Sequence, residues 1–284
     1  MTPIGIMEQM SMFEYDFMIH AFIAGGIVAI VAGIVGFFLV MREQTFAGHA
    51  LSHIGFAGAT GSALLGLSPM SGLIFITLLS GAIMGTLEGR IRGRDVAIGM
   101  VLSIALGLGM LFLHFYTAYA TQINTLLFGN VLGVDTPMLW TLASLGLISL
   151  SLLALIARPL IFASLQPELA EAKGVSLRII SILFLIIVAL TTSGCIQIVG
   201  ILLVFTLMVG PAAAAQQLSH KLGTGISLAA FLALIETWGG LAMAYWSDWP
   251  TSFCITALSG SIYLLSLSWK RNLTRRKIMK PNPA

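Results

Sequence analysis

Charge is scarce in this sequence: Asp, Glu, Lys and Arg make up only 9% of its 284 residues, against about a quarter in an ordinary soluble domain. The scarcity extends over the whole length, because apolar runs recur along the chain and no polar domain interrupts them. The mean hydropathy is +0.99. This composition excludes a water-soluble globular domain and indicates a single integral membrane domain over residues 1–284.

Three other features are absent: a basic N-terminal segment, a set of cysteines and an ATP-binding motif. No Lys or Arg precedes Arg42, so the chain lacks the basic start of a cleavable signal peptide, and the first apolar run is expected to remain in the mature protein. The two cysteines, Cys195 and Cys254, are too few for a disulfide framework. No G-x-x-x-x-G-K-[ST] motif occurs, which excludes ATP binding by a P-loop in this chain.

Nine apolar segments are long enough to cross a bilayer as helices, which takes about 20 residues each. We predict them at residues 17–41, 45–67, 70–88, 96–118, 138–157, 177–193, 197–218, 223–245 and 250–268. The apolar piece LLFGNVLGV, within residues 119–137, is too short to span and is predicted to be re-entrant or interfacial. The predicted fold class is an all-α integral membrane protein, a polytopic bundle of about nine transmembrane helices.

Alternating crossings place all 14 Lys and Arg residues on one face of the membrane. Only acidic residues such as Asp16, Asp135 and Asp248 fall on the other face. Because cytoplasmic loops carry the excess of basic residues, the N-terminus is predicted outside and the C-terminus inside. The basic pI of about 9.0 therefore reflects membrane topology, and no nucleic-acid partner is expected.

The stretch GHALSH places His49 and His53 on one face of the second predicted span. His53 lies roughly 16 Å beyond Arg42, close to the middle of a ~30 Å hydrocarbon core. One such histidine could simply bond to a carbonyl, but two on one face favour a polar pathway or a metal site. Ala50 stands where zinc proteases carry a catalytic glutamate, so holding or passing an ion is favoured over hydrolysis.

Glu236 is the other charge predicted near the membrane midplane, at roughly the depth of His53. A carboxylate there must be neutralised by a proton, a cation or a histidine. Glu236 is therefore a third candidate metal ligand, and a protonated side chain hydrogen-bonded to Thr237 or to a carbonyl is the alternative. The remaining histidines, His20, His114 and His220, lie at helix ends or in a loop, where interfacial or solvated roles are expected. Pro211 is predicted to kink the seventh span.

The longest predicted cytoplasmic connection, residues 163–176, contains QPELAEAKGV. This pattern predicts a short helix with Pro167 at its start, acidic residues in its first turn, and Gly174 as its terminator. Glu168 and Glu171 are poorly placed against anionic lipid headgroups. A protein partner is therefore predicted to bind this segment.

Four stretches occur in an order typical of one family: MREQTFAGHALSHIGFAG, QPELAEAKGV, VGILLVFTLMVGPAAAA and YWSDWPTSFCITALSGSIYLLSL. Over nearly its full length the chain resembles the membrane-spanning permease subunits of bacterial ABC importers for zinc and manganese. The resemblance implies a non-catalytic transport subunit of the bacterial plasma membrane, with no permanently bound cofactor. It implies a coupling helix that docks in a groove of a separate ATPase subunit. The implied coupling residues are Gln166, Pro167, Glu168, Leu169, Ala170, Glu171, Ala172 and Gly174.

The resemblance also implies two copies of this permease, two ATPases and an extracytoplasmic binding protein that delivers the ion. The family usually has Asp at the position of His49, whereas His53 matches its pattern. Because nitrogen in place of oxygen favours zinc over manganese, the predicted cargo is a divalent transition metal, with zinc preferred to manganese or iron.

Two alternatives stay open at this point. A gradient-driven secondary transporter would use Glu236 as its titrating group, although no inverted repeat is evident. An intramembrane metal-dependent hydrolase would use the two histidines, and Ala50 speaks against it.

Overall fold

The computed structural model describes residues 12–87, 94–115 and 127–278, and nearly all of these residues are helical. No strand occurs within these ranges. The α-helices are α2 (Asp16–Met41), α3 (Thr45–Leu64), α4 (Pro69–Thr86), α5 (Arg94–Phe115), α7 (Thr136–Leu165), α8 (Pro167–Ala172), α9 (Leu177–Leu218), α10 (Leu222–Ser247) and α11 (Thr251–Ile278). Two short 3-10 helices, η1 (Met12–Glu14) and η2 (Val131–Gly133), precede α2 and α7.

Seven of the described helices are long and apolar enough to cross a membrane: α2, α4, α5, α7, α9, α10 and α11. The helix α3 is not one of these seven. It has 20 residues, which is enough for a crossing, and it carries the two histidines. It is enclosed by α4, α5 and α9. The protein is thus an all-helical, multi-pass membrane protein, as its composition predicts.

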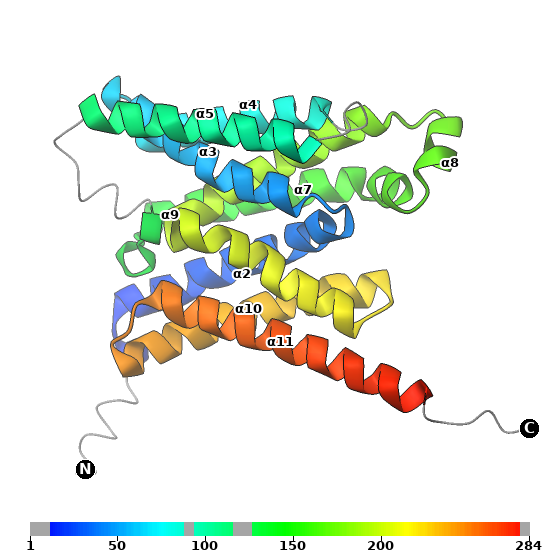
Figure 1. The fold of residues 1–284 in the computed structure, drawn as a ribbon. Helices are drawn as coiled ribbons and strands as arrows, with labels where there is room; N and C mark the ends of the chain where they lie inside the picture. Colours follow the sequence, from blue (N-terminus) through cyan, green and yellow to red (C-terminus); the bar gives the residue numbers. More distant parts are fainter. Residues whose placement is uncertain (1–11, 88–93, 116–126, 279–284) are drawn as a thin grey trace, which may run out of the picture.

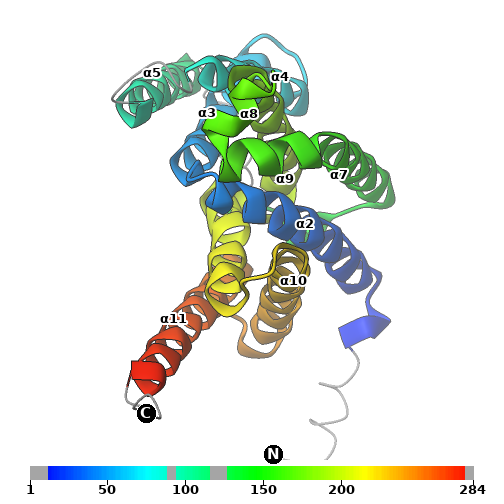
Figure 2. The same ribbon diagram turned by 90° about the vertical axis from the view of Figure 1, so that its right-hand side faces the viewer.

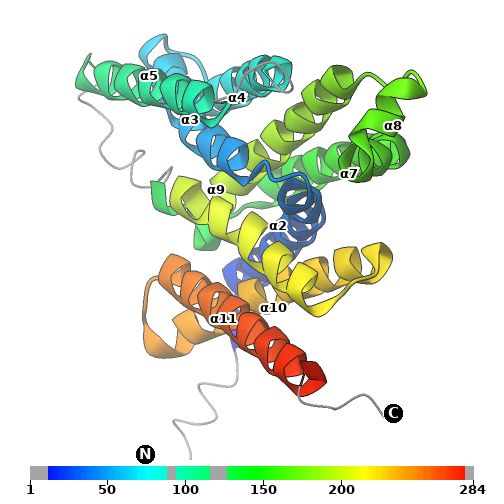
Figure 3. The same cartoon turned by 45° about the vertical axis from the view of Figure 1, so that its right-hand side comes forward.

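The helix α9 contains two of the predicted crossings. Its 42 residues would extend about 63 Å if straight, twice the thickness of the hydrocarbon core. Its backbone leaves the helical region only at Gly200, with φ 76° and ψ 166°. The Thr192 hydroxyl lies 3.7 Å from the Met208 sulfur, although these residues would be about 24 Å apart along a straight helix. The chain therefore reverses at Gly200, and its two arms are in contact near the bend and diverge away from it (Figure 3).

Counting the two arms of α9 separately, and including α3, gives the nine crossings predicted from the sequence. The turn between the sixth and seventh falls at Gly200, a few residues later than predicted. Pro211, where a kink was predicted, keeps helical backbone angles inside the second arm. The α9 bend is therefore set by a glycine and not by the proline.

A second backbone segment holds this bend in place. A Cβ atom at Gly200 would lie 2.3 Å from the Gly129 nitrogen, and one at Gly129 would lie 2.3 Å from the Ile198 oxygen. The two backbones are thus in direct contact, which only glycine at both positions permits. Residues 127–129 of the predicted re-entrant piece pack on the apex of α9, and η2 packs mainly on α2. Residues 116–126 lie outside the described part of the chain.

The helix connections gather at two ends of the bundle (Figure 1). One end carries the α2–α3 turn, α8, the α9–α10 turn and the last turns of α11. The opposite end carries the start of α2, the α3–α4 turn and the α10–α11 turn. The first end includes the basic residues Arg42, Lys173, Arg178, Lys221 and Lys270. This arrangement agrees with the predicted alternation of crossings; that the basic end faces the cytoplasm stays a prediction.

The bundle is organised around α9, which packs on α2, α3, α4, α7, α10 and α11. Viewed from the side in Figure 2, α3, α4 and α5 lie on one flank of α9, and α10 and α11 lie on the other. In α9, 78% of the most apolar window is buried, but in α5 only 11% is. The outer helices therefore present large apolar surfaces, as expected of lipid-facing helices.

Candidate metal-transport site

His49 and His53 lie against each other on α3, with ring centroids 4.7 Å apart and ring planes at 74°. The ring of Phe205, from the second arm of α9, contacts His49 edge-on at 4.9 Å. Both histidines are only partly buried in the single chain. The Nδ1 atom of His49 is buried and has no hydrogen-bond partner. An unpartnered buried nitrogen is unusual in proteins and fits a group that awaits a ligand.

The other polar side chains of the same helix do not join the pair. Ser52 donates to the Gly48 carbonyl at 3.1 Å, and Thr60 donates to the Phe56 carbonyl at 2.9 Å. Both hydroxyls are thereby satisfied by the backbone of α3 itself. Neither hydroxyl is therefore available to the histidine pair.

Close packing against glycines fixes how α3 presents the histidines. A Cβ atom at Gly58 would lie 2.4 Å from the carbonyl oxygen of Gly72 on α4, and one at Gly61 would touch Phe112 of α5. Small residues at such crossings let helix backbones approach where lipid supplies no hydrophobic drive. The helix α3 is thereby enclosed by α4, α5 and α9.

Glu236 lies in α10 and is fully buried, with no hydrogen-bond partner for either carboxylate oxygen. It faces Ser259 of α11, and the hydroxyl of Thr237 also has no partner. The predicted alternative, a hydrogen bond from Glu236 to Thr237 or to a carbonyl, is not formed. The carboxylate is thus buried between α10 and α11, near the Ser259 hydroxyl.

The structure brings His49 and His53 together but leaves Glu236 apart from them. The helix α3 packs on α4, α5 and α9, whereas α10 packs on α2, α9 and α11, so α9 separates the two sites (Figure 2). Among residues 12–87, 94–115 and 127–278, no three His, Cys, Asp or Glu side chains are grouped as a metal site. A role for Glu236 as a ligand beside the two histidines stays a prediction.

The remaining histidines occupy the peripheral positions expected of them. The Nδ1 atom of His20 lies 3.1 Å from the Val134 carbonyl oxygen, which ties α2 to the segment before α7. His114 and His220 are exposed. None of the three approaches the pair on α3.

The predicted docking segment forms the short helix α8, with Pro167 at its first position. Its end is closed by two backbone bonds, from Gly174 to the Glu171 carbonyl and from Val175 to the Ala170 carbonyl, and Gly174 has φ +84°. This is the Schellman pattern, which satisfies the last carbonyls of a helix. The start and the terminator of the helix are both as predicted.

The helix α8 offers nearly all of its side chains to a partner. Only Ala170 is buried, against the ends of α7 and α9. The Lys173 ammonium lies 5.7 Å from the centroid of the Phe162 ring. The exposed residues are Gln166, Pro167, Glu168, Leu169, Glu171, Ala172 and Gly174. Leu165 and Leu169 add exposed apolar side chains at this end of the bundle.

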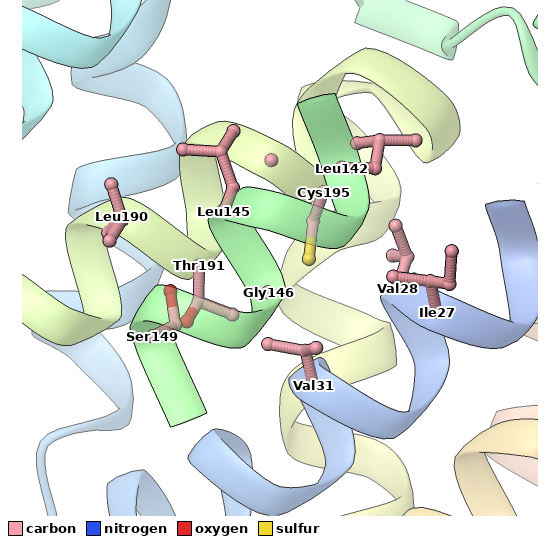
Figure 4. A pocket seen from close by; sticks show the side chains of 11 residues that line it. Ile27, Val28, Val31, Leu142, Leu145, Gly146, Ser149, Leu190, Thr191 and Cys195 are labelled. Carbon is pink, nitrogen blue, oxygen red and sulfur yellow. The ribbon is translucent and has the colours of Figure 1, made fainter. Parts of the chain in front are cut away.

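Two cavities lie away from the histidines and lack ion-binding chemistry. One of about 10 Å³, between α2, α7 and the first arm of α9, is lined by apolar side chains and by Ser149, Thr191 and Cys195 (Figure 4). Its volume is about that of one water molecule. The other, of about 550 Å³, is lined mainly by apolar residues of α3, α4 and α5, such as Phe75 and Phe112.

Sequence reasoning missed two contacts of the candidate site, Phe205 against His49 and Ser259 against Glu236. Both join residues that are far apart in the chain and belong to different helices. Neither Phe205 nor Ser259 carries a local sequence signal that distinguishes it from neighbouring membrane-embedded residues. Only the helix arrangement identifies them.

Comparison with known proteins agrees with this architecture. A family model described as the ABC 3 transport family matches residues 14–270. The manganese transport system membrane protein MntC of Listeria monocytogenes is 30% identical over 233 residues, covering 82% of this chain and 83% of the relative. The manganese import system permease protein ScaB of Streptococcus gordonii is 29% identical over 268 residues, covering 93% of this chain and 96% of the relative.

Solved structures show the same fold. The structure described as PsaBC from Streptococcus pneumoniae in complex with Fab superposes with a TM-score of 0.81 at 28% sequence identity, over 92% of this chain and 95% of that chain. An inward-facing metal-chelate type ABC transporter matches with a TM-score of 0.68 over 88% of this chain and 85% of that chain. At 16% identity, the second likeness concerns the fold alone.

Proposed function

We infer the ion path and the cargo from the premise that this chain belongs to the ABC 3 transport family and is a permease subunit of a metal ABC importer. We propose that residues 1–284 form one permease domain in which the transported ion passes His49 and His53. The observation that carries this proposal is the pair of adjacent imidazoles on α3, with a buried, unpartnered nitrogen on His49. Such a pair would bind a first-row transition metal ion in passing.

A second copy of the chain would complete this site. Partly exposed imidazoles at this depth are costly against lipid and normally face a partner or a water-filled path. One chain supplies two imidazoles, and a twofold copy would supply two more. Four nitrogen donors suit the tetrahedral coordination that zinc prefers, and they would also bind neighbouring transition metals. We therefore propose that the histidine face of α3 lies at the interface of a homodimer.

Manganese is the cargo that the relatives favour, because MntC and ScaB are both named as manganese transport proteins. The preference for zinc expected from the sequence has no support among these relatives and rests on His49 alone. Zinc is kept as the second candidate for one reason, which is that two imidazoles form a softer ligand set than an imidazole and a carboxylate.

Replacing His49 by aspartate tests how this residue selects the metal. We expect His49→Asp to shift the ratio of manganese to zinc uptake by about tenfold toward manganese, a change of ~1.4 kcal/mol, because a carboxylate suits the harder ion. Radiolabelled manganese and zinc uptake into proteoliposomes that contain the complete transporter measures the ratio. His49→Asn is the matched control and should lower uptake without this shift. An unchanged ratio in His49→Asp would show that His49 does not determine which metal is transported.

We further propose that the ATPase subunit docks on α8. An ABC importer permease works with an ATPase and with a substrate-binding protein, and this chain has no P-loop of its own. The helix α8 supports the proposal because it projects from the bundle with all of its residues exposed except Ala170. Neither a gradient-driven mechanism through Glu236 nor hydrolysis at the histidines is favoured by any feature of the described residues.

The double variant Glu168→Lys with Ala172→Arg tests the docking surface. Charges of the wrong sign in a desolvated contact cost several kcal/mol, and about 1.4 kcal/mol is already tenfold in affinity. We expect co-purification of the ATPase with the tagged permease to fall at least about tenfold, and ATP-driven uptake to fall with it. Thr136→Lys, an exposed position at the opposite end of the bundle, is the control. Full recovery of the ATPase with the double variant would refute docking on α8.

A further inference from the structure

The turn between α2 and α3 is bonded to α7 and α9 through the side chains of Arg42 and Gln44. The Gln44 side chain is fully buried, and its Nε2 donates to the Ser181 hydroxyl of α9 at 3.2 Å. The Arg42 guanidinium donates to the Ser164 hydroxyl of α7 at 3.1 Å. It also lies 5.6 Å from the centroid of the Phe184 ring. Both bonds join segments more than a hundred residues apart in the chain.

The two acceptors flank α8 in sequence and in space. Ser164 is next to the last residue of α7, immediately before α8, and Ser181 lies in the second turn of α9, immediately after it. The helix α8 itself packs on both α7 and α9. The α2–α3 turn is thus bonded to both elements that carry α8.

The same turn forms the base of the helix that carries the histidines. Gln44 is the residue that precedes the first turn of α3, and His49 follows only about 7.5 Å further along the helix axis. Between the two bonded residues, Glu43 has φ 55°, a left-handed conformation that non-glycine residues adopt rarely and at some cost. The connection is therefore short, and its conformation is fixed by its surroundings.

We propose that Gln44 and Arg42 are positioning residues that couple the ATPase-docking helix to the metal path. Through the bonds to Ser181 and Ser164, the base of α3 moves as one body with the ends of α7 and α9, so displacement of α8 is passed to His49 and His53. This inference rests on the proposed function. It assigns a coupling role to two residues that touch neither the ATPase-docking surface nor the metal.

The test measures metal transported per ATP hydrolysed by the complete transporter in proteoliposomes. Gln44→Met keeps the volume but removes the donor, and Ser181→Ala removes only the acceptor hydroxyl. Coupling between sites typically changes affinity or activity by about 5 to 150-fold. We expect both variants to assemble with the ATPase and to hydrolyse ATP at nearly the normal rate, while the transport ratio falls at least about fivefold. The double variant should be no worse than Gln44→Met alone, because this substitution already leaves the Ser181 hydroxyl without the Nε2 donor.

Ser193→Ala is the matched control, since Ser193 is also a buried serine of α9 but donates only to the Ala189 carbonyl of its own helix. It should leave the ratio unchanged. An unchanged ratio in Gln44→Met and Ser181→Ala, or equal losses of uptake and hydrolysis, overturns the proposal. If Gln44→Met does not assemble, Ser181→Ala decides the question by itself. Failure of the proposed function would appear separately, as a lack of ATP-driven uptake by the unmodified protein.

Discussion

Replacing His53 by alanine is expected to reduce metal uptake at least about tenfold while the permease still assembles with its ATPase. Losing even an outer partner of a metal ligand costs about 10 to 100-fold in affinity or activity, and His53→Ala removes a proposed ligand itself. The His53 ring also packs against that of His49, 4.7 Å away, so the variant leaves the remaining imidazole less well positioned. His49→Ala should reduce uptake to a similar extent.

Uptake of radiolabelled metal into proteoliposomes, together with the amount of ATPase recovered with the permease, separates loss of transport from loss of assembly. His114→Ala is the control, because His114 is an exposed histidine on a neighbouring helix and should transport normally. Normal uptake by both His49→Ala and His53→Ala would return the two histidines to a packing role and would remove the basis of the proposed ion path.

Gly200→Ala is expected to destabilise the fold strongly, although it adds only one methyl group. The conformation at Gly200, φ 76° and ψ 166°, is one that only glycine adopts readily, and other residues pay about 1–3 kcal/mol for it. The added Cβ would also lie 2.3 Å from the Gly129 nitrogen, where backbone and not a flexible side chain must give way. The reversal between the two arms of α9 should open, with loss of packing around the most buried helix.

The thermal denaturation midpoint of the detergent-solubilised protein, followed by size-exclusion chromatography, measures this effect. Gly260→Ala is the matched control, since Gly260 lies on the exposed face of α11 and an added Cβ meets nothing within 4 Å. Alanine there should be neutral or stabilising by up to about 1 kcal/mol, the difference in helix propensity. A Gly200→Ala protein that denatures at the unmodified midpoint would show that the bend does not depend on glycine.

Helix positions were the most predictable part of the fold, because each crossing needs a long apolar run to satisfy its backbone in lipid. The helix ends were less predictable. The run in α7 was expected to stop at residue 157, yet the helix continues through Pro159 to Leu165. Proline removes one backbone bond, and neighbouring helices compensate for such losses in membrane proteins. A local pattern cannot show whether a neighbour is present.

The candidate site was predictable only in part for a related reason. His49 and His53 were placed together correctly because a helix fixes the geometry of residues four apart. Glu236 was placed at a similar depth, but depth along the membrane normal gives no lateral position, and α9 lies between Glu236 and the histidines. The bonds of Gln44 and Arg42 to other helices were missed because their partners, Ser181 and Ser164, lie far away in the sequence.

The sequence by itself therefore determined the membrane location, the nine crossings, the paired histidines and the short helix α8, because each follows from composition or from periodicity within one segment. The tertiary structure decided how the segments contact one another. It set the reversal of α9 at Gly200, the contact of Phe205 with His49, the separation of Glu236 from the histidines, and the bonds from the α2–α3 turn to the helices beside α8. These depend on how helices pack side by side, and packing in lipid is set by close contacts between distant residues, which no local pattern records.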